Sequence, residues 1–229
     1  MNRIRNNIIA FCFMLPILLL NMCYGLLNSS NRGVTSLATD LDARIPFIKE
    51  FIIPYVIWYP LVPLVFIYIC IKDKLTYCKL LVSLVFGLII SYITFYFFQT
   101  TILRPSLVGN DLFTNIIRAL YKVDNPFNCF PSIHVMTCFL MIEGIWKCKE
   151  KNLFMNISVT ILNIIIILST FFVKQHVVLD AVYGILIALV TFLLANLFIK
   201  NKVADLFKKP YLLINRVSLR KTNESDVKY

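Results

Sequence analysis

Three residues of this chain have the types and the spacing that acid–base or nucleophilic chemistry needs. His176 and Asp180 are four positions apart, so on a helix they lie one turn apart on the same face. The only other histidine is His134, two residues after Ser132. Each histidine stands where a polar loop enters a long apolar run. We therefore expect both to lie near the starts of helices, at the same end of the molecule.

This pattern fits covalent catalysis on a phosphate group. A carboxylate on one ring nitrogen fixes the tautomer of a histidine and leaves the other nitrogen free to attack. We expect His176, oriented by Asp180, to attack phosphorus and form a phosphohistidine. His134 is expected to protonate the departing oxygen and then to activate water.

Phosphate binding needs positive charge and hydrogen-bond donors near the two histidines. Arg104 and Lys174 carry permanent charge in the loops that enter this region, and Ser132 offers a hydroxyl. Helix N-termini add free backbone N–H groups and the positive end of a dipole. We expect these groups to hold the charge on the phosphate oxygens during transfer, without a metal or another cofactor.

The elements that must position these residues are membrane helices. The 229-residue chain is 59% hydrophobic and 15% charged. Its apolar runs are continuous, which predicts spanning helices, whereas the strands of a barrel would alternate. The predicted fold class is all-α, a polytopic membrane protein with a six-transmembrane helix bundle. The spans are expected at residues 8–27, 51–71, 80–98, 131–146, 153–173 and 177–199.

Local patterns add three expectations. Apolar residues recur at helical spacing in residues 111–122, which predicts a helix that lies on the membrane surface or packs on the bundle. Pro131 is expected at the first position of the helix in the fourth span. The first apolar run is interpreted as an uncleaved span, because no small-residue cleavage site follows it.

The net charge of +11 indicates membrane orientation and not nucleic-acid binding, because Lys and Arg flank the apolar runs. More of them fall on the side that holds both termini, which predicts cytoplasmic N- and C-termini in the cell membrane. The loops with Arg104 and Lys174 then face the extracytoplasmic side. Residues 1–200 are expected to form the membrane domain and residues 201–229 a basic cytoplasmic tail.

Short motifs also resemble a known family. Phe130-Pro131-Ser132-Ile133-His134 and Ser169-x6-His176-x3-Asp180 look like the second and third signature motifs of the type 2 phosphatidic acid phosphatase superfamily, and Arg104-Pro105 resembles the end of the first. The matched core is residues 104–184. The resemblance implies metal-independent removal or transfer of a phosphate group on a lipid. It also implies that His176 is the nucleophile, His134 the general acid and Asp180 the orienting acid.

The motifs depart from the family pattern at three positions. The family has lysine where Phe97 stands, glycine where Ile133 stands and arginine where Thr170 stands. Lys174 is expected to replace one of the two missing cations. The Lys-Gln-His run with Pro-Ser-x-His is reminiscent of the inositol phosphorylceramide synthase-like branch, which transfers head groups.

The lipid and the acceptor stay open. The expected partners are the bilayer and a lipid phosphate, which could be phosphatidate, a polyprenyl diphosphate, phosphatidylglycerol phosphate or a head-group donor. Three rival hypotheses remain. The first is a zinc site at His134, His176, Asp180 and Asp124. The second is a small transporter with a polar pathway, and the third is an inactive homologue that has lost phosphate-binding cations.

Overall fold

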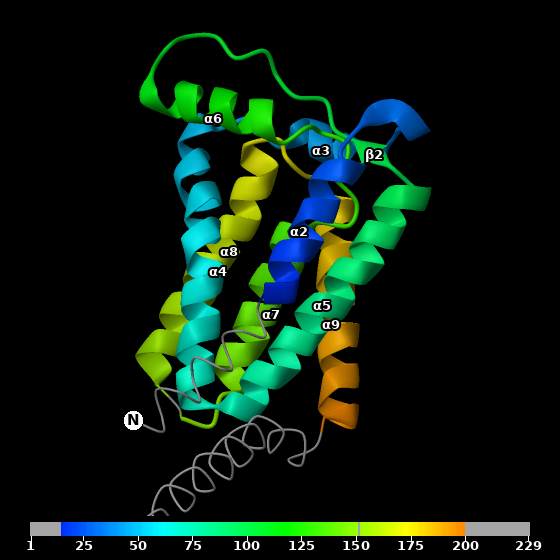
Figure 1. The fold of residues 1–229 in the computed structure, drawn as a ribbon. Helices are drawn as coiled ribbons and strands as arrows, with labels where there is room; N and C mark the ends of the chain where they lie inside the picture. The colour runs from blue at the N-terminus through cyan, green and yellow to red at the C-terminus, as the bar shows by residue number, and fades with distance from the viewer. Residues whose placement is uncertain (1–14, 151, 200–229) are drawn as a thin grey trace, which may run out of the picture.

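Long apolar runs become helices because only a helix or a closed barrel satisfies every backbone polar group inside a bilayer. The computed structural model describes residues 15–150 and 152–199. In this part of the chain, six longer helices stand side by side and form a bundle (Figure 1). They are α2 (Leu15–Leu27), α4 (Ile52–Lys72), α5 (Lys74–Phe97), α7 (Ile133–Lys147), α8 (Leu153–Phe172) and α9 (Val178–Phe198).

The described residues are mostly helical, as predicted, and four of their helices are long and apolar enough to cross a membrane, namely α4, α5, α8 and α9. The predicted count of six spans is not confirmed. Helix α7 has 15 residues and α2 has 13 described residues, whereas a span needs about 20. The start of the first predicted span and the tail 201–229 lie outside the described residues. The structure therefore supports membrane insertion, and the six-span count stays a prediction.

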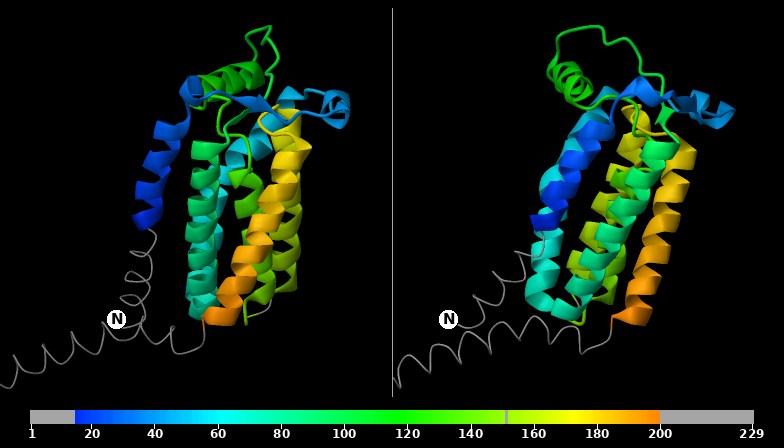
Figure 2. Two further views of the ribbon diagram at one scale, coloured as in Figure 1. Left: turned by 90° about the vertical axis from the view of Figure 1, so that its right-hand side faces the viewer. Right: turned by 45° about the vertical axis from the view of Figure 1, so that its right-hand side comes forward.

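Helix α7 is the central helix of the bundle. It packs against α4, α5, α8 and α9, and its buried side chains Met136 and Leu140 belong to the main hydrophobic cluster together with Phe66 and Leu80. Helix α2 instead stands at one edge, beside α5 (Figure 2). The start of α7 is thus held firmly from several sides, whereas α2 contributes to the wall of the bundle.

Helix α5 begins at Lys74, earlier than the predicted start near residue 80. The side chain of Asp73 accepts hydrogen bonds from the amides of Leu75 and Thr76, at 3.1 and 3.2 Å, and so caps the helix. An aspartate N-cap is among the strongest local signals for a helix start. It lies before the apolar run, so hydropathy places the boundary too late.

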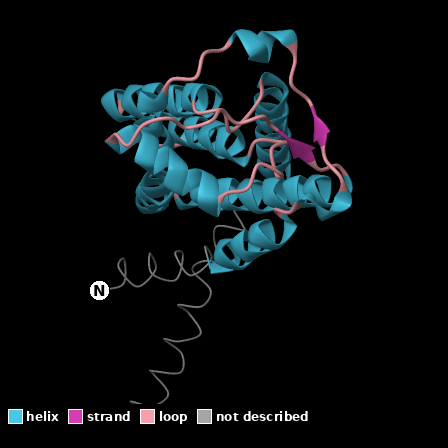
Figure 3. Ribbon diagram, turned by 90° about the horizontal axis from the view of Figure 1, so that it is seen from above, coloured by secondary structure: helices cyan, strands magenta, loops and turns pink. Residues whose placement is uncertain are grey.

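Shorter elements cover one end of the bundle, where the loops before α7 and α9 also lie (Figure 3). Strands β1 and β2 pair in parallel there, with Thr35 opposite Thr100. The elements are η1 (Ser30–Arg32), β1 (Thr35–Ser36), α3 (Asp40–Arg44), η2 (Lys49–Phe51), β2 (Thr100–Thr101) and α6 (Leu112–Val123).

The helix predicted for residues 111–122 is confirmed as α6. Asp111 caps it by accepting a hydrogen bond from the Thr114 amide at 3.2 Å. Its buried residue Ile117 packs with Ile52 and Tyr55 of α4. Of the two predicted placements, the structure has the helix packed on the bundle, where it lies across the end of α4 (Figure 1).

Candidate active site

His176 and Asp180 stand at the start of α9. Asp180 is fully buried, and its Oδ2 accepts a hydrogen bond from the Val177 amide at 3.0 Å. His176 Nδ1 lies 3.0 Å from the Cys129 carbonyl oxygen and 3.3 Å from Asp180 Oδ2. Because both partners are acceptors, Nδ1 carries the proton and Nε2 of the neutral ring keeps its lone pair. Among the described residues, Nε2 has no hydrogen-bond partner.

Cys129 contacts His176 through its backbone carbonyl and not through its thiol. Burial raises the pKa of the Cys129 thiol, and its Sγ lies 3.5 Å from the Pro126 carbonyl oxygen, to which it donates. The reactive form of cysteine is the thiolate. A buried thiol with a raised pKa is therefore a poor rival to His176 as nucleophile.

Hydrogen bonds with the region of α3 hold the loop before α9 in place. The Lys174 amino group donates to the carbonyls of Asp42 and Ile45, at 3.2 and 2.6 Å, and the Asp42 carboxylate accepts from the Val178 amide at 2.8 Å. Burial alone would raise the pKa of Asp42, but hydrogen bonds from Thr39 and Val178 outweigh burial and lower the pKa. Asp42 is thus ionised at neutral pH and holds the first turn of α9.

Ser132 and His134 begin α7, but Pro131 does not take the first helical position that the sequence predicts. Ser132 is the N-cap, and its hydroxyl oxygen accepts a hydrogen bond from the Val135 amide at 3.3 Å. Serine is a strong N-cap, so the helix starts one residue after it and the proline lies outside. The Ser132 amide donates to the Asp180 carbonyl at 3.0 Å. This hydrogen bond ties the start of α7 to the start of α9.

The imidazole of His134 lies among aromatic rings of α4. Its ring centroid is 4.1 Å from that of Trp58 and 4.7 Å from that of Tyr55, and 5.8 Å from that of His176. His134 Nε2 is buried and has no hydrogen-bond partner among the described residues. Leaving a buried polar atom unpaired is costly. This nitrogen is therefore available to a bound substrate or water.

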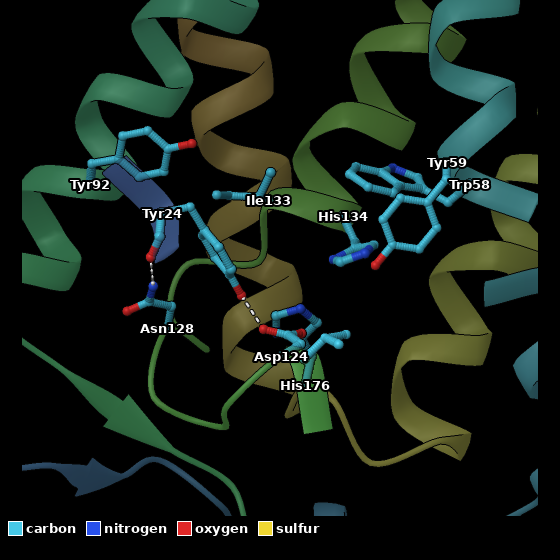
Figure 4. A pocket seen from close by; sticks show the side chains of 10 residues that line it. Tyr24, Trp58, Tyr59, Tyr92, Asp124, Asn128, Ile133, His134 and His176 are labelled. Carbon is cyan, nitrogen blue, oxygen red and sulfur yellow. Dashed lines mark hydrogen bonds between the residues drawn. The ribbon is translucent and has the colours of Figure 1, made fainter. Parts of the chain in front are cut away.

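The two histidines line one cavity of about 290 Å³ (Figure 4). Most of its wall is aromatic, and it contains one carboxylate. Asp124 Oδ1 accepts hydrogen bonds from the Tyr24 hydroxyl at 2.7 Å and from the Asn28 side-chain amide at 3.0 Å. The lining residues are Tyr24, Trp58, Tyr59, Tyr92, Val123, Asp124, Asn128, Ile133, His134 and His176.

Arg104 lies near this cavity without lining it. Its guanidinium donates to the Asp124 carbonyl and to Gln175 Oε1, each at 2.7 Å, and stands 4.2 Å from the centre of the Tyr121 ring. Arg104 Nε is buried and unpaired within the described residues. Arg104 thus contacts Gln175, the residue before His176, and its Nε–H group has no hydrogen-bond partner among the described residues.

Lys174 does not line the cavity that the two histidines share. It lines a second cavity of about 240 Å³, whose wall also contains His176, and its own backbone is left-handed, with φ 51°. The structure therefore brings His134, His176, Ser132 and Asp180 together. It leaves Arg104 and Lys174 outside the lining of the cavity that the histidines share, each bound to protein carbonyls.

The sequence alone did not predict the aromatic residues that line the cavity or the partners of Asp124. Tyr55, Trp58 and Tyr59 have the spacing i, i+3, i+4, which puts them on one face of α4, and this signal could have marked a functional face. Tyr24 gives no such signal, because its partner Asp124 is distant in the sequence.

A metal site has no ligand cluster here. In residues 15–150 and 152–199, no three His, Cys, Asp or Glu side chains gather into a group that could hold a metal ion. Asp180 and Nδ1 of His176 already bind each other at the buried end of the site. The rival zinc site at His134, His176, Asp180 and Asp124 is therefore not supported by the described residues.

A family model for the PAP2 superfamily matches residues 42–194, which is more than half of the chain. The chain belongs to the PAP2 superfamily. The match includes both histidines, Asp180 and Arg104. No curated protein and no solved structure matches the sequence. Members of the PAP2 superfamily typically hydrolyse phosphate esters, so the family indicates a phosphatase-type function on lipid phosphates for this PAP2 protein.

Gly184 lets α9 of the PAP2 protein lie against the first turn of α7. A Cβ at this position would stand 2.7 Å from the Ser132 carbonyl oxygen and 3.3 Å from the Met136 amide nitrogen, and backbone atoms in a packed core do not move aside easily. We expect Gly184→Ala to lower the free energy of unfolding by about 1–3 kcal/mol. It should also slow turnover, because it pushes the two histidine-bearing helix starts apart. Thermal unfolding and phosphate release measure the two effects.

Gly25→Ala is the matched control for this substitution. Gly25 lies in α2, and no atom stands within 4 Å of the position of its added Cβ. Alanine is the better helix former by about 0.5–1 kcal/mol, so we expect unchanged turnover and equal or higher stability. Equal losses in both variants would contradict the close approach of α9 and α7 at Gly184.

Proposed function

We propose that this PAP2 protein is an integral membrane lipid-phosphate phosphatase that works through a phosphohistidine on His176, without a metal. The arrangement of the His176 ring carries the proposal. Nδ1 is held between two acceptors at 3.0 and 3.3 Å, and the residue lines a cavity together with His134. A histidine held in this way presents an unprotonated Nε2 as its reactive atom.

In the first step, His176 Nε2 attacks phosphorus, so that an N–P bond forms while the P–O bond to the lipid breaks. The negative charge of the bound phosphate would favour the imidazolium form of the buried His134 ring, which then gives its proton to the departing lipid oxygen. The positive charge left on the His176 ring is offset by the buried carboxylate of Asp180, 3.3 Å from Nδ1. The products of this step are the lipid alcohol and the phosphohistidine.

In the second step, the neutral His134 takes a proton from a water molecule, whose oxygen attacks the phosphohistidine. The N–P bond breaks, inorganic phosphate leaves, and His134 is again the imidazolium. The two ring centroids are 5.8 Å apart, a separation at which both rings can act on one phosphoryl group. The buried Nε2 of His134, unpaired among the described residues, supports its role as the acid and base.

Ser132, Arg104 and Lys174 are proposed to hold the phosphoryl oxygens. Arg104 contacts Gln175, next to His176, and Lys174 lines a cavity whose wall also contains His176. Both side chains now donate to carbonyl oxygens. Charge-assisted hydrogen bonds to phosphate are stronger than bonds to neutral carbonyls, so a bound phosphate would draw the two cations toward His176.

We also propose that the site faces the extracytoplasmic side of the cell membrane in a six-span protein with cytoplasmic termini. The distribution of Lys and Arg along the sequence supports this orientation. The loops before α7 and α9 lie at the same end of the bundle, beside α3 and α6 (Figure 1). All parts of the site are therefore reached from one side.

Transfer of a phosphate-bearing head group to an alcohol, as in the inositol phosphorylceramide synthase-like branch, is the second candidate. Asp124 favours it, because a carboxylate in the cavity wall can accept a hydrogen bond from an acceptor hydroxyl. Phe97 and Thr170 stand where the family motifs have cations. Fewer cations favour a singly charged phosphodiester over a doubly charged monoester.

Phosphate release by the purified full chain, with and without EDTA, tests the proposed function. The substrates are phosphatidate, a polyprenyl diphosphate and phosphatidylglycerol phosphate. We expect release from at least one of them at a rate that EDTA leaves unchanged, because the proposed steps use no metal. Loss of activity in EDTA that zinc restores would contradict the mechanism.

The same assay separates the rival functions. Transfer of a labelled head group to an added alcohol, without phosphate release, would favour the second candidate. A chain that neither releases nor transfers phosphate would be an inactive homologue or a transporter, and flux across vesicles would distinguish these two.

A further inference from the structure

A third cavity, an apolar groove, lies between α2 and α5. Its volume is about 560 Å³, and it is lined by side chains of these two helices alone, none of them charged. Several of its residues are strongly exposed, including Leu26 at 80% and Ile93 at 54%. The lining residues are Cys23, Leu26, Leu27, Ile89, Tyr92, Ile93, Tyr96 and Phe97. The groove therefore opens on the outer surface of an apolar helix, α5.

Tyr92 lies between this groove and the histidine cavity, because it lines both. Its side chain extends from α5 toward the cavity in Figure 4. The residue is only 8% exposed, and its hydroxyl is buried without a hydrogen-bond partner among the described residues. A buried hydroxyl without a partner is costly. The position between two cavities suggests that a ligand supplies the missing partner.

Helix α2 borders both the groove and the histidine cavity. Its Tyr24 ring contacts Phe95 of α5 edge-on, with centroids 6.1 Å apart, and the Tyr24 hydroxyl donates to Asp124 in the histidine cavity. Helix α2 stands at the edge of the bundle beside α5 (Figure 2). The same helix thus borders the groove with one set of residues and the cavity with another.

We propose that the groove between α2 and α5 holds the hydrocarbon chain of the lipid substrate, and that the Tyr92 hydroxyl donates to an oxygen in the polar linkage between the chain and the phosphate. This inference rests on the proposed function. The uncharged lining fits a hydrocarbon chain, and the shared wall at Tyr92 lets one molecule place its chain in the groove and its phosphate beside His176.

The groove is expected to raise the rate by fixing the position of the bound lipid. A chain that leaves the bilayer for the groove gains little from the hydrophobic effect, because it is already surrounded by lipid. Holding the chain instead fixes where the phosphate lies. A misplacement of about 1 Å at a reacting centre can cost on the order of 100-fold in rate. The effect of the groove should therefore appear in turnover of long-chain lipids.

Photolabelling of the full chain in nanodiscs tests the inference without depending on turnover. The probe is phosphatidate with a diazirine near the end of one acyl chain. We expect label on the peptides of α2 and α5 that border the groove, and competition by unlabelled dioleoyl phosphatidate but not by phosphatidylcholine. Label spread evenly over the lipid-facing sides of α4, α8 and α9 would overturn the proposal.

Ile93→Trp places an indole in the groove, and Ile90→Trp is its matched control. Both residues are exposed isoleucines on α5, and Ile90 does not line the groove. We expect Ile93→Trp to lose the competed label and Ile90→Trp to keep it. Equal labelling of the two variants would contradict the proposal.

Turnover then separates this inference from the proposed function. In Tyr92→Phe, phosphate release from dioleoyl phosphatidate should fall about fivefold, the usual effect of one lost hydrogen bond. Release from the same lipid in Ile90→Trp, a residue that lines neither the groove nor the histidine cavity, should not change. Specific groove labelling without release from any phosphate ester would keep the lipid site and reject the phosphatase. Phosphate release without labelling of the groove would support the phosphatase and reject the lipid site in the groove.

Discussion

Replacing His176 with alanine is expected to abolish phosphate release, with a fall of at least about 10⁴-fold, since loss of a covalent nucleophile costs up to about 10⁶-fold in a comparable catalytic triad. Two other groups near the site in the described residues could in principle attack. The Cys129 thiol is buried with a raised pKa, and His134 is already needed as the acid and base of the proposed steps. Phosphate release from the preferred lipid measures the loss.

His176→Asn is the better variant for interpretation, because asparagine keeps an N–H group that can donate to the Cys129 carbonyl. It should be as inactive as His176→Ala while its thermal unfolding stays close to that of the original protein. His134→Ala provides the contrast. Loss of a general acid costs about 10²–10⁴-fold, so some release should remain. Substantial activity in His176→Asn would contradict the assignment of the nucleophile.

Replacing Asp180 with alanine is expected to lower kcat by about 10²–10⁴-fold, the range of effects seen when acid–base groups are disrupted. Asp180 offsets the charge that the His176 ring gains in the first step, through the contact of 3.3 Å between its Oδ2 and Nδ1. Its carboxylate also caps α9 through the Val177 amide. Loss of that cap should cost about 1 kcal/mol of stability.

Asp180→Asn separates these two effects. The asparagine oxygen can still accept from the Val177 amide, so the unfolding temperature should stay near that of the original protein. The Cys129 carbonyl, 3.0 Å from Nδ1, still fixes the tautomer of His176. We therefore expect a loss of kcat that reflects the missing charge and is smaller than in Asp180→Ala. Equal activity of Asp180→Asn and the original protein would show that the charge of Asp180 plays no part.

Hydropathy predicted the bundle well where a helix is simply an apolar run. The runs at residues 51–71, 153–173 and 177–199 correspond closely to α4, α8 and α9. The errors lie at helix starts that side chains decide. Asp73 moves the start of α5 toward the N-terminus, and Ser132 leaves Pro131 outside α7. Such caps depend on one side chain, which an average over a window does not detect.

The candidate site was predictable only as far as local spacing allows. The His176–Asp180 contact follows from a separation of one helical turn. The meeting of His134 with His176 required only that both helices start at the same end. The direction of Lys174 was not predictable, because its amino group binds the carbonyls of Asp42 in α3 and of Ile45 just after it, which are far away in the sequence. The groove between α2 and α5 likewise depends on the packing of two distant segments.

Direct detection of the phosphohistidine tests the central claim. The purified protein would be mixed with phosphatidate carrying a radioactive phosphate, quenched in base, in which phosphohistidine is stable, and digested. We predict label on the peptide that contains His176 and none in His176→Asn. Label on any other residue, or rapid phosphate release without a labelled intermediate, would contradict the mechanism.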